Sequence, residues 1–136
     1  MLPTLYRIET ACFSSPWSEA SISAELGDEN SVFLVTEDEH GPYGFVIVKI
    51  AADECEVYNI AVLPEHRRKG AARALLEAAL EKARALGARC AYLEVRESNE
   101  AAKKLYYSMD FEALGLRKDY YDEPRENAVL MKKELQ

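Results

Sequence analysis

The chain has 136 residues, of which 49% are hydrophobic and 30% charged, and its net charge is −7 at pH 7. This length favours a single domain over residues 1–136, with room for one hydrophobic core. The acidic balance argues against nucleic acid as the main partner, because phosphate binding needs a basic face. It suits a basic peptide or protein, although acidity can also serve solubility alone.

Cysteine usage and hydropathy exclude further classes of protein. Cys12, Cys55 and Cys90 form no Cys-x-x-Cys pair, so we expect neither a disulfide framework nor a zinc site. No ligand cluster surrounds either histidine, and we expect no metal centre. The N-terminus has no basic segment followed by an apolar one, and the longest apolar stretch, Tyr43 to Ala52, is too short to cross a bilayer. We therefore expect a cytoplasmic protein without membrane contact.

The first part of the chain predicts two helices followed by three strands. Leu2 to Phe13 has apolar residues at helical spacing, and Ser18 can cap a second helix that Gly27 ends. A polar turn over Glu37 to Pro42 joins the first two strands. The second helix is expected over Glu19 to Leu26, and the strands over Ser31 to Thr36, Tyr43 to Ala52 and Cys55 to Leu63.

The third strand changes its alternation part-way. Up to Val57 the large apolar residues occupy one set of alternate positions, and from Tyr58 to Val62 they occupy the other set. A slip of one residue turns every later side chain to the opposite face. A β-bulge between Val57 and Asn59 would produce this slip. A strand buried on both faces, where alternation means little, explains it equally well.

The segment after this strand predicts an anion site. Pro64 ends the strand, and Gly70, Ala71 and Ala72 open a long helix. Small residues let a ligand approach the backbone, and the first turn of a helix offers free N–H groups. The basic residues of this turn are Arg67, Arg68, Lys69 and Arg73. Together these features favour a pyrophosphate ligand, with a solvated basic helix start as the alternative.

The second half of the chain adds two helices and three strands. One helix is expected over Gly70 to Leu86, with Gly87 as its stop. The other is expected over Asn99 to Met109, and its apolar side consists of Ala101, Ala102, Leu105 and Met109. The strands are expected over Cys90 to Val95, Phe111 to Tyr121 and Ala128 to Glu134. This order of elements predicts an α/β (α+β) fold with a mixed sheet covered by helices.

Several motifs resemble those of a known family. Arg67-x-x-Gly70-x-Ala72 resembles the (Arg/Gln)-x-x-Gly-x-(Gly/Ala) signature with which the GNAT superfamily of N-acetyltransferases holds the pyrophosphate of coenzyme A. The RimI-type branch, the ribosomal-protein-alanine N-acetyltransferases, has blocks similar to Ser15-Pro16-Trp17-Ser18-Glu19, Tyr58-Asn59-Ile60-Ala61-Val62, Leu93-Glu94-Val95-Arg96-x-Ser98-Asn99-x-Ala101-Ala102, Leu105-Tyr106, Tyr120-Tyr121 and Ala128-x-Leu130-Met131. The resemblance implies a mostly antiparallel mixed sheet with about four helices.

The resemblance also implies a site for acetyl-CoA. It places the donor across Ile60, Ala61 and Val62 and across the turn from Arg67 to Arg73. Pantetheine amides can add to an exposed strand edge like a peptide, and a backbone N–H of the strand could stabilise the oxyanion. Asn99 is implied to contact the cofactor, and it could equally cap the helix that follows it.

Two residues of the motifs are implied to be catalytic. Glu94 would be the general base, because a carboxylate between Leu93 and Val95 should be partly desolvated, which raises its pKa. The alternative is an ordinary outward-facing glutamate. Tyr106, two helical turns beyond Asn99, would be the general acid for the departing thiolate. As a lone tyrosine it would more often be a packing residue.

The implied activity is acetylation of the N-terminal amine of a protein, with a basic ribosomal protein that begins with alanine as the acceptor. Trp17, Asn59, Tyr120 and Tyr121 would line the peptide site, although Trp17 and one tyrosine could be packing residues. A lysine or a small-molecule amine is an alternative acceptor. A coenzyme A-binding module without turnover is an alternative of another class.

Two positions depart from the family's pattern. The family usually has a strand before the first helix, whereas too few residues precede that helix here to form one, so either the given start is late or this edge strand is missing. The family's glycine after the catalytic helix is Asp110 in this chain. We expect Asp110 to adopt the left-handed conformation, at a strain of roughly 1 kcal/mol.

Overall fold

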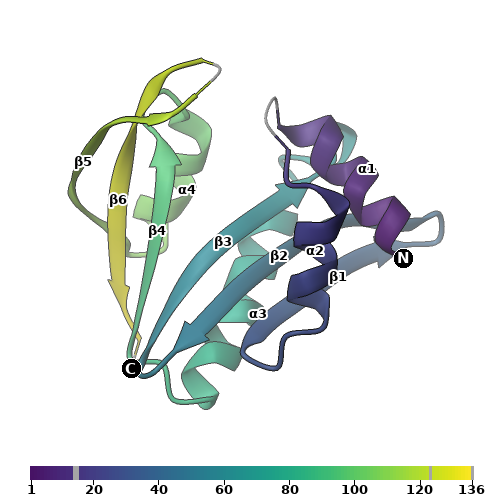
Figure 1. The fold of residues 1–136 in the computed structure, drawn as a ribbon, viewed down its shortest axis with the longest axis horizontal. Coiled ribbons are helices and arrows are strands. Elements are labelled where there is room, and N and C mark those ends of the chain that lie inside the picture. Colours follow the sequence, from purple (N-terminus) through teal and green to yellow (C-terminus); the bar gives the residue numbers. More distant parts are fainter. Residues whose placement is uncertain (14–15, 123, 136) are drawn as a thin grey trace.

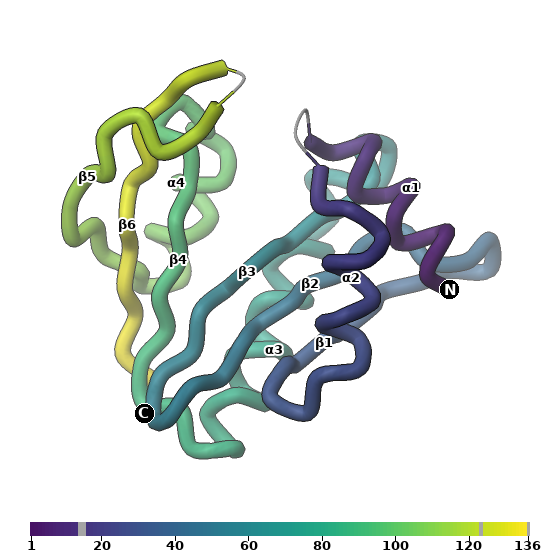
Figure 2. Tube along the Cα trace, viewed as in Figure 1, coloured from purple at the N-terminus to yellow at the C-terminus, as the bar shows by residue number. Residues whose placement is uncertain are grey.

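The computed structural model describes residues 1–13, 16–122 and 124–135, and its elements follow the predicted order (Figures 1 and 2). The α-helices of these ranges are α1 (Leu2–Cys12), α2 (Glu19–Leu26), α3 (Ala71–Ala85) and α4 (Glu100–Ser108). The strands are β1 (Ser31–Asp38), β2 (Gly41–Ala51), β3 (Glu54–Val62), β4 (Cys90–Arg96), β5 (Glu112–Tyr121) and β6 (Glu126–Glu134). A short 3₁₀ turn at Pro64–His66, which the sequence analysis did not predict, follows β3.

All six strands form one sheet in the order β1-β2-β3-β4-β6-β5. Only β3 and β4 run parallel, so the sheet is mixed and mostly antiparallel, as predicted. The predicted turn from Glu37 to Pro42 is too long, because Asp38 already pairs with Gly41 across a register shift. In the part of the chain that the structure describes, β1 is an edge strand and no strand precedes α1.

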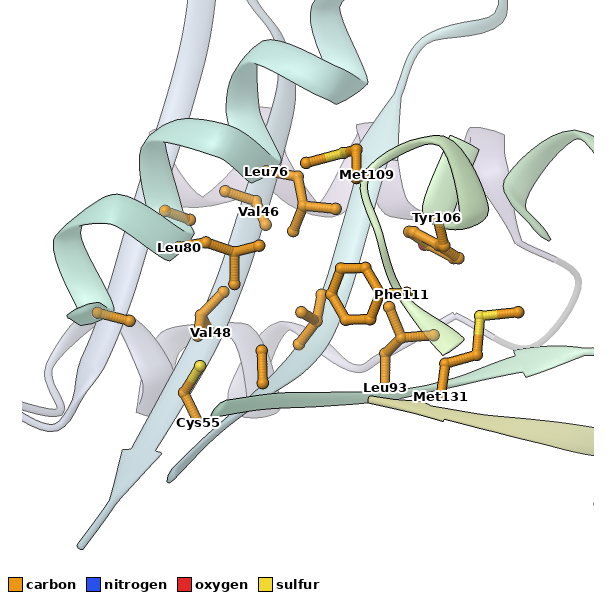
Figure 3. Close-up of a cluster of buried hydrophobic side chains, with 14 of the residues drawn as sticks. Val46, Val48, Cys55, Leu76, Leu80, Leu93, Tyr106, Met109, Phe111 and Met131 are labelled. Carbon is orange, nitrogen blue, oxygen red and sulfur yellow. The ribbon is translucent and has the colours of Figure 1, made fainter. Parts of the chain in front are cut away.

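Helices cover both faces of the sheet, with α1 and α2 on one face of the β1–β3 half and α3 on the other (Figure 1). The alternation of β2 explains this arrangement. Val46 and Val48 pack in the cluster that includes α3, whereas Phe45 and Ile47 pack in the cluster that includes α1 and α2. The larger cluster continues under α4 to Phe111 on the way into β5 (Figure 3). Central strands are therefore buried on both faces.

Helix α4 keeps most of its predicted apolar side. Ala102 and Leu105 are half-buried and Met109 is buried, whereas Ala101 is exposed. Tyr106 is also buried on this helix. Asp110, after the helix, has a φ of +71°, which confirms the left-handed conformation expected at this position.

The change of alternation in β3 is a β-bulge. Val48 pairs with Val57 and Ile47 pairs with Asn59, so Tyr58 has no partner on β2. Of the two explanations that the sequence left open, the bulge is the one observed. At the bulge, 38% of Tyr58 is exposed, whereas Val57 before it is buried and Asn59 after it is half-buried.

Strand β3 separates from β4 after Glu56, just before the bulge. The parallel pairing consists of three residue pairs, Glu54 with Cys90, Cys55 with Ala91 and Glu56 with Tyr92. From there the two strands diverge, and they leave an opening that we call the fork (Figure 1). On their other sides β3 stays paired with β2, and β4 with β6. In the fork, each of the two strands therefore has one unpaired edge and one edge that is paired with its other neighbour.

Candidate active site

The turn between β3 and α3 presents backbone donors. Arg68 and Gly70 have φ angles of +65° and +82°, and Gly70 is the residue before the helix. The N–H of Ala74 donates to the Gly70 carbonyl at 3.0 Å, so the earlier N–H groups of the helix have no partner within it. No side chain caps this end. Such a turn can hold a phosphate, as predicted.

The basic side chains of the turn are not equivalent. Arg67 donates through Nε to the carbonyl of Val62 at 2.9 Å, and Arg73 donates to the hydroxyl of Ser108 on α4. Arg68 and Lys69 are exposed. The guanidinium of Arg67 thus anchors the turn to the end of β3 through Nε, and its contact with the donor stays a prediction.

The remaining residues that were predicted to contact the donor lie on β3 and at the starts of α3 and α4. Ile60 is half-buried, and Ala61 and Val62 are buried on the strand that forms one bare edge. Ala71 and Ala72 are half-buried at the start of α3. Asn99 accepts a hydrogen bond from the N–H of Ala102 at 3.1 Å and caps α4. The capping role of Asn99 is thus observed, while the contact of Asn99 with a cofactor stays a prediction.

The carboxylate of Glu94 lies on β4 where the fork opens, and its side chain is 15% exposed. The hydroxyl of Tyr120 donates to Oε1 at 3.2 Å. Arg117 Nε lies 3.0 Å from Oε2, close enough for an ion pair, but its N–H is not directed at this oxygen. Among the described residues, Oε2 accepts no hydrogen bond although it is buried. Oε2 therefore lies beside the Arg117 cation and still has the capacity to accept a hydrogen bond.

Tyr106 is 7% exposed, and its ring packs edge-on against Phe111 with centroids 5.8 Å apart (Figure 3). Burial, and then the neighbouring phenol of Tyr121, raise the pKa of Tyr106 to about 12. The phenol therefore keeps its proton at neutral pH, which a general acid requires. The packing role named as an alternative is observed, while the role as general acid stays a prediction.

One wall of the fork is aromatic. The rings of Trp17 and Tyr58 are tilted toward each other with centroids 6.0 Å apart. Asn59, which was predicted to line the substrate site, donates its side-chain N–H to Glu9 at 2.6 Å. The bulge thus gives the exposed position to Tyr58, which the sequence analysis did not select, because it turns Asn59 toward α1.

The opposite wall is the end of β5, which Figure 1 places across the open end of the fork from the end of α1. Tyr120 and Tyr121 pack edge to face at 5.0 Å. Arg96 holds this wall, with its guanidinium 4.4 Å from the ring centroid of Tyr121. It also donates to the carbonyls of Asp122 and Pro124 at 3.1 and 2.9 Å.

The sequence of the chain matches a known family. The model of the acetyltransferase (GNAT) family matches residues 2–111. The chain belongs to the GNAT family. This confirms the resemblance stated from the motifs, and the six-stranded sheet with its flanking helices confirms the fold expected from it.

Relatives within the GNAT family are similar over most of their length. The [ribosomal protein bS18]-alanine N-acetyltransferase of Escherichia coli strain K12 is 36% identical over 132 residues, which cover 96% of this chain and 88% of the relative. The enzyme of the same name from Haemophilus ducreyi is 37% identical over 130 residues, covering 93% and 89%. The crystal structure of the E. coli enzyme superposes with a TM-score of 0.91 at 34% identity, covering 99% of this chain and 88% of that one.

Three charged residues of this GNAT site were missed by the sequence analysis. Glu56 pairs in register with Tyr92 and so faces the fork next to Glu94; burial, and then the charge of Glu94, raise its pKa. Arg96 and the buried Glu9 are the others. The alternation of β3 and β4 could have shown Glu56 and Arg96, whereas nothing local marks Glu9, which sits among apolar residues of α1.

The described residues contain neither a metal-ligand cluster nor a membrane-spanning helix. Within residues 1–13, 16–122 and 124–135, no three His, Cys, Asp or Glu side chains converge as ligands for a metal ion. In those same ranges, each helix is too short or too polar to cross a bilayer.

Proposed function

We propose that this GNAT protein transfers the acetyl group of acetyl-CoA to the N-terminal α-amine of a protein, and that the acceptor is a ribosomal protein that begins with alanine. The observation that carries the proposal is the Glu94 carboxylate at the fork, where Oε1 accepts a hydrogen bond from Tyr120 and Oε2, beside Arg117, accepts none. The names of the relatives at 36% and 37% identity supply the acceptor. Ribosomal proteins are made in the cytoplasm, where we expect this enzyme to act.

The residues of the fork and of the turn fit the donor. The bare edge of β3 offers backbone groups to the amides of pantetheine over Ile60, Ala61 and Val62. The uncapped N–H groups that follow Gly70, with the exposed Arg68 and Lys69 beside them, suit a pyrophosphate. Arg67 contributes by anchoring the turn.

When bound, acetyl-CoA supplies a thioester whose carbonyl carbon is open to attack by an amine. Glu94 accepts the proton of the attacking amine at Oε2, directly or through one water, as the N–C bond forms. Tyr106 gives its proton to the sulfur as the C–S bond breaks. A backbone N–H of β3 at the fork stabilises the negative charge on the carbonyl oxygen. The carboxylic acid of Glu94 then gives its proton to solvent, and the phenolate of Tyr106 takes a proton from solvent.

The acceptor site is the space between the two aromatic walls, Trp17 with Tyr58 and Tyr120 with Tyr121. An α-amine has an ordinary pKa of about 7.7–8.0, against about 10.4 for the lysine side chain, so a base removes its proton more easily. The charge of −7 attracts a basic tail toward this space.

Free-thiol release from acetyl-CoA with a matched peptide pair tests the acceptor. One peptide has a free N-terminal alanine and no lysine, and the other has a blocked N-terminus and one internal lysine. We expect turnover with the first alone. Turnover with the second alone would assign a lysine acceptor, and silence with both would point to a small-molecule amine or to a binding module.

The variant Tyr106→Phe separates an enzyme from a binding module. An enzyme loses turnover on this change while its acetyl-CoA binding, measured by calorimetry, stays intact. If the parent protein binds acetyl-CoA and releases no thiol with any amine, the catalytic assignment of Glu94 and Tyr106 is wrong.

A further inference from the structure

Glu9 is the one charged side chain that is almost fully buried in the described part of the chain, with 1% exposed. It lies on α1, whose other buried residues are Leu5 and Ile8. Burying an ionised carboxylate costs several kcal/mol unless hydrogen bonds compensate. A leucine would pack there at no such cost, so packing does not explain the residue.

The two oxygens of Glu9 join two segments that are far apart in sequence. Oε2 accepts the backbone N–H of Trp17 at 2.8 Å, and Oε1 accepts the side-chain N–H of Asn59 at 2.6 Å. Burial raises the pKa of Glu9, and these two hydrogen bonds oppose that effect. Both contacts require acceptors, so both are best made by the ionised carboxylate.

Each of these segments carries one half of the aromatic wall. Trp17 belongs to the segment of residues 16–18, and Asn59 is the neighbour of the bulged Tyr58. The ring contact of Trp17 with Tyr58, at 6.0 Å, is thereby bracketed by hydrogen bonds to one buried carboxylate. The same bulge opens the strand edge at which the donor would lie.

We propose that Glu9 is a positioning residue that fixes the Trp17 segment against the β3 bulge, and so aligns the acceptor amine with the donor edge of the fork. The inference rests on the proposed function. A misplacement of about 1 Å far from the chemistry can cost about 10²-fold in rate, which gives such a link a catalytic effect without contact with the reacting atoms.

The test compares three variants with a control. Glu9→Met removes both acceptors, Asn59→Ala cuts one contact, and Glu9→Gln can keep both if Asn59 turns its amide over. The control is Ile8→Val, which removes one methyl group from the adjacent buried residue and costs about 0.5–1.5 kcal/mol of stability. Unfolding midpoints identify how much of any effect is general destabilisation.

We expect Glu9→Met and Asn59→Ala to lower kcat/KM for the alanine peptide by about 10- to 100-fold, while acetyl-CoA affinity stays at the parent value. Glu9→Gln should lose less, and the combination of Glu9→Met with Asn59→Ala should lose little more than either alone, because both break one link. Equal kinetic losses in Ile8→Val at equal stability would overturn the proposal.

A second readout needs no substrate. Trp17 is the only tryptophan, so its emission and its quenching by acrylamide report the order of its segment. Quenching should rise in Glu9→Met and stay at the parent value in Ile8→Val. If Glu9→Met does not fold, parent-like quenching and kinetics in both Glu9→Gln and Asn59→Ala would overturn the link. A parent inactive toward the peptide refutes the proposed acceptor instead, and leaves the quenching result to decide.

Discussion

At the scale of single residues, the position of the Glu94 carboxylate on β4 suits the proposed general base. Its strand places it between buried neighbours, Tyr120 donates a hydrogen bond to Oε1, and Arg117 lies beside Oε2 without donating a hydrogen bond to it. Glu94→Gln keeps the shape and removes the basic oxygen. We expect kcat to fall by about 10²–10⁴-fold while acetyl-CoA affinity is retained.

Thiol-release kinetics and calorimetry measure the two quantities for Glu94→Gln. Glu97→Gln is a matched control, because Glu97 is exposed on the same segment and a glutamine there can still accept from Asn127. Parent-like kcat in Glu94→Gln would remove Glu94 from the mechanism.

Tyr106 predicts a pH dependence of stability. Its pKa is about 12 in the folded protein, against 10.0 ordinarily, because burial disfavours the phenolate. The unfolded chain therefore releases this proton first as the pH rises, and the folded state loses stability between pH 10 and about 12. Below pH 10 the phenol is neutral in both states and contributes no such loss.

Tyr106→Phe lacks the ionisable group, so its unfolding midpoint should fall less than that of the parent over this alkaline range. Denaturant unfolding at a series of pH values measures the difference between the two proteins, which cancels the contributions of other tyrosines and cysteines. An unchanged difference across the range would mean that Tyr106 is not shielded from water in solution.

At the scale of elements, the start of α3 predicts a binding defect. Gly70 has a φ of +82°, and a Cβ built there meets nothing within 4 Å. Gly70→Glu therefore costs only backbone strain, about 1–2 kcal/mol, but it places an anion among the N–H groups meant for a pyrophosphate. We expect acetyl-CoA binding, measured by calorimetry, to be lost.

Gly87 offers the control for this change. It follows the other end of α3, has a φ of +109°, and also has open space around a built Cβ. Gly87→Glu should thus lose similar stability and keep acetyl-CoA affinity. Tight binding by Gly70→Glu would show that the pyrophosphate lies elsewhere.

Local sequence signals were sufficient for the elements and for part of the site. The caps and stops at Ser18, Gly27 and Gly87 and the alternation in β3 are short-range features, and they predicted helix ends and a possible bulge. The family motifs supplied Glu94 and Tyr106. The role of Glu9 was not predictable, because it depends on Asn59, fifty residues away, and its neighbours in sequence indicate only a helix face.

At the scale of the whole molecule, the acidic surface predicts a salt effect. Attraction between the charge of −7 and a basic peptide tail acts over a Debye length of about 10 Å at 0.1 M salt and about 3 Å at 1 M. KM for an alanine peptide with a basic tail should rise with salt, while kcat stays constant. A peptide with the same first residues and a neutral tail should show little change, and equal salt dependence of the two would contradict attraction between the protein and the tail.

The fork also gives the backbone an uneven exposure to solvent. Along β3 beyond Glu56 and β4 beyond Tyr92, one edge is paired and the other is bare. Amide hydrogens should therefore exchange for deuterium slowly and rapidly at alternate residues, within strands that are otherwise buried. A ligand bound in the fork would slow only the rapid set. Deuterium uptake along these two strands would then record, residue by residue, how far down the fork the donor reaches.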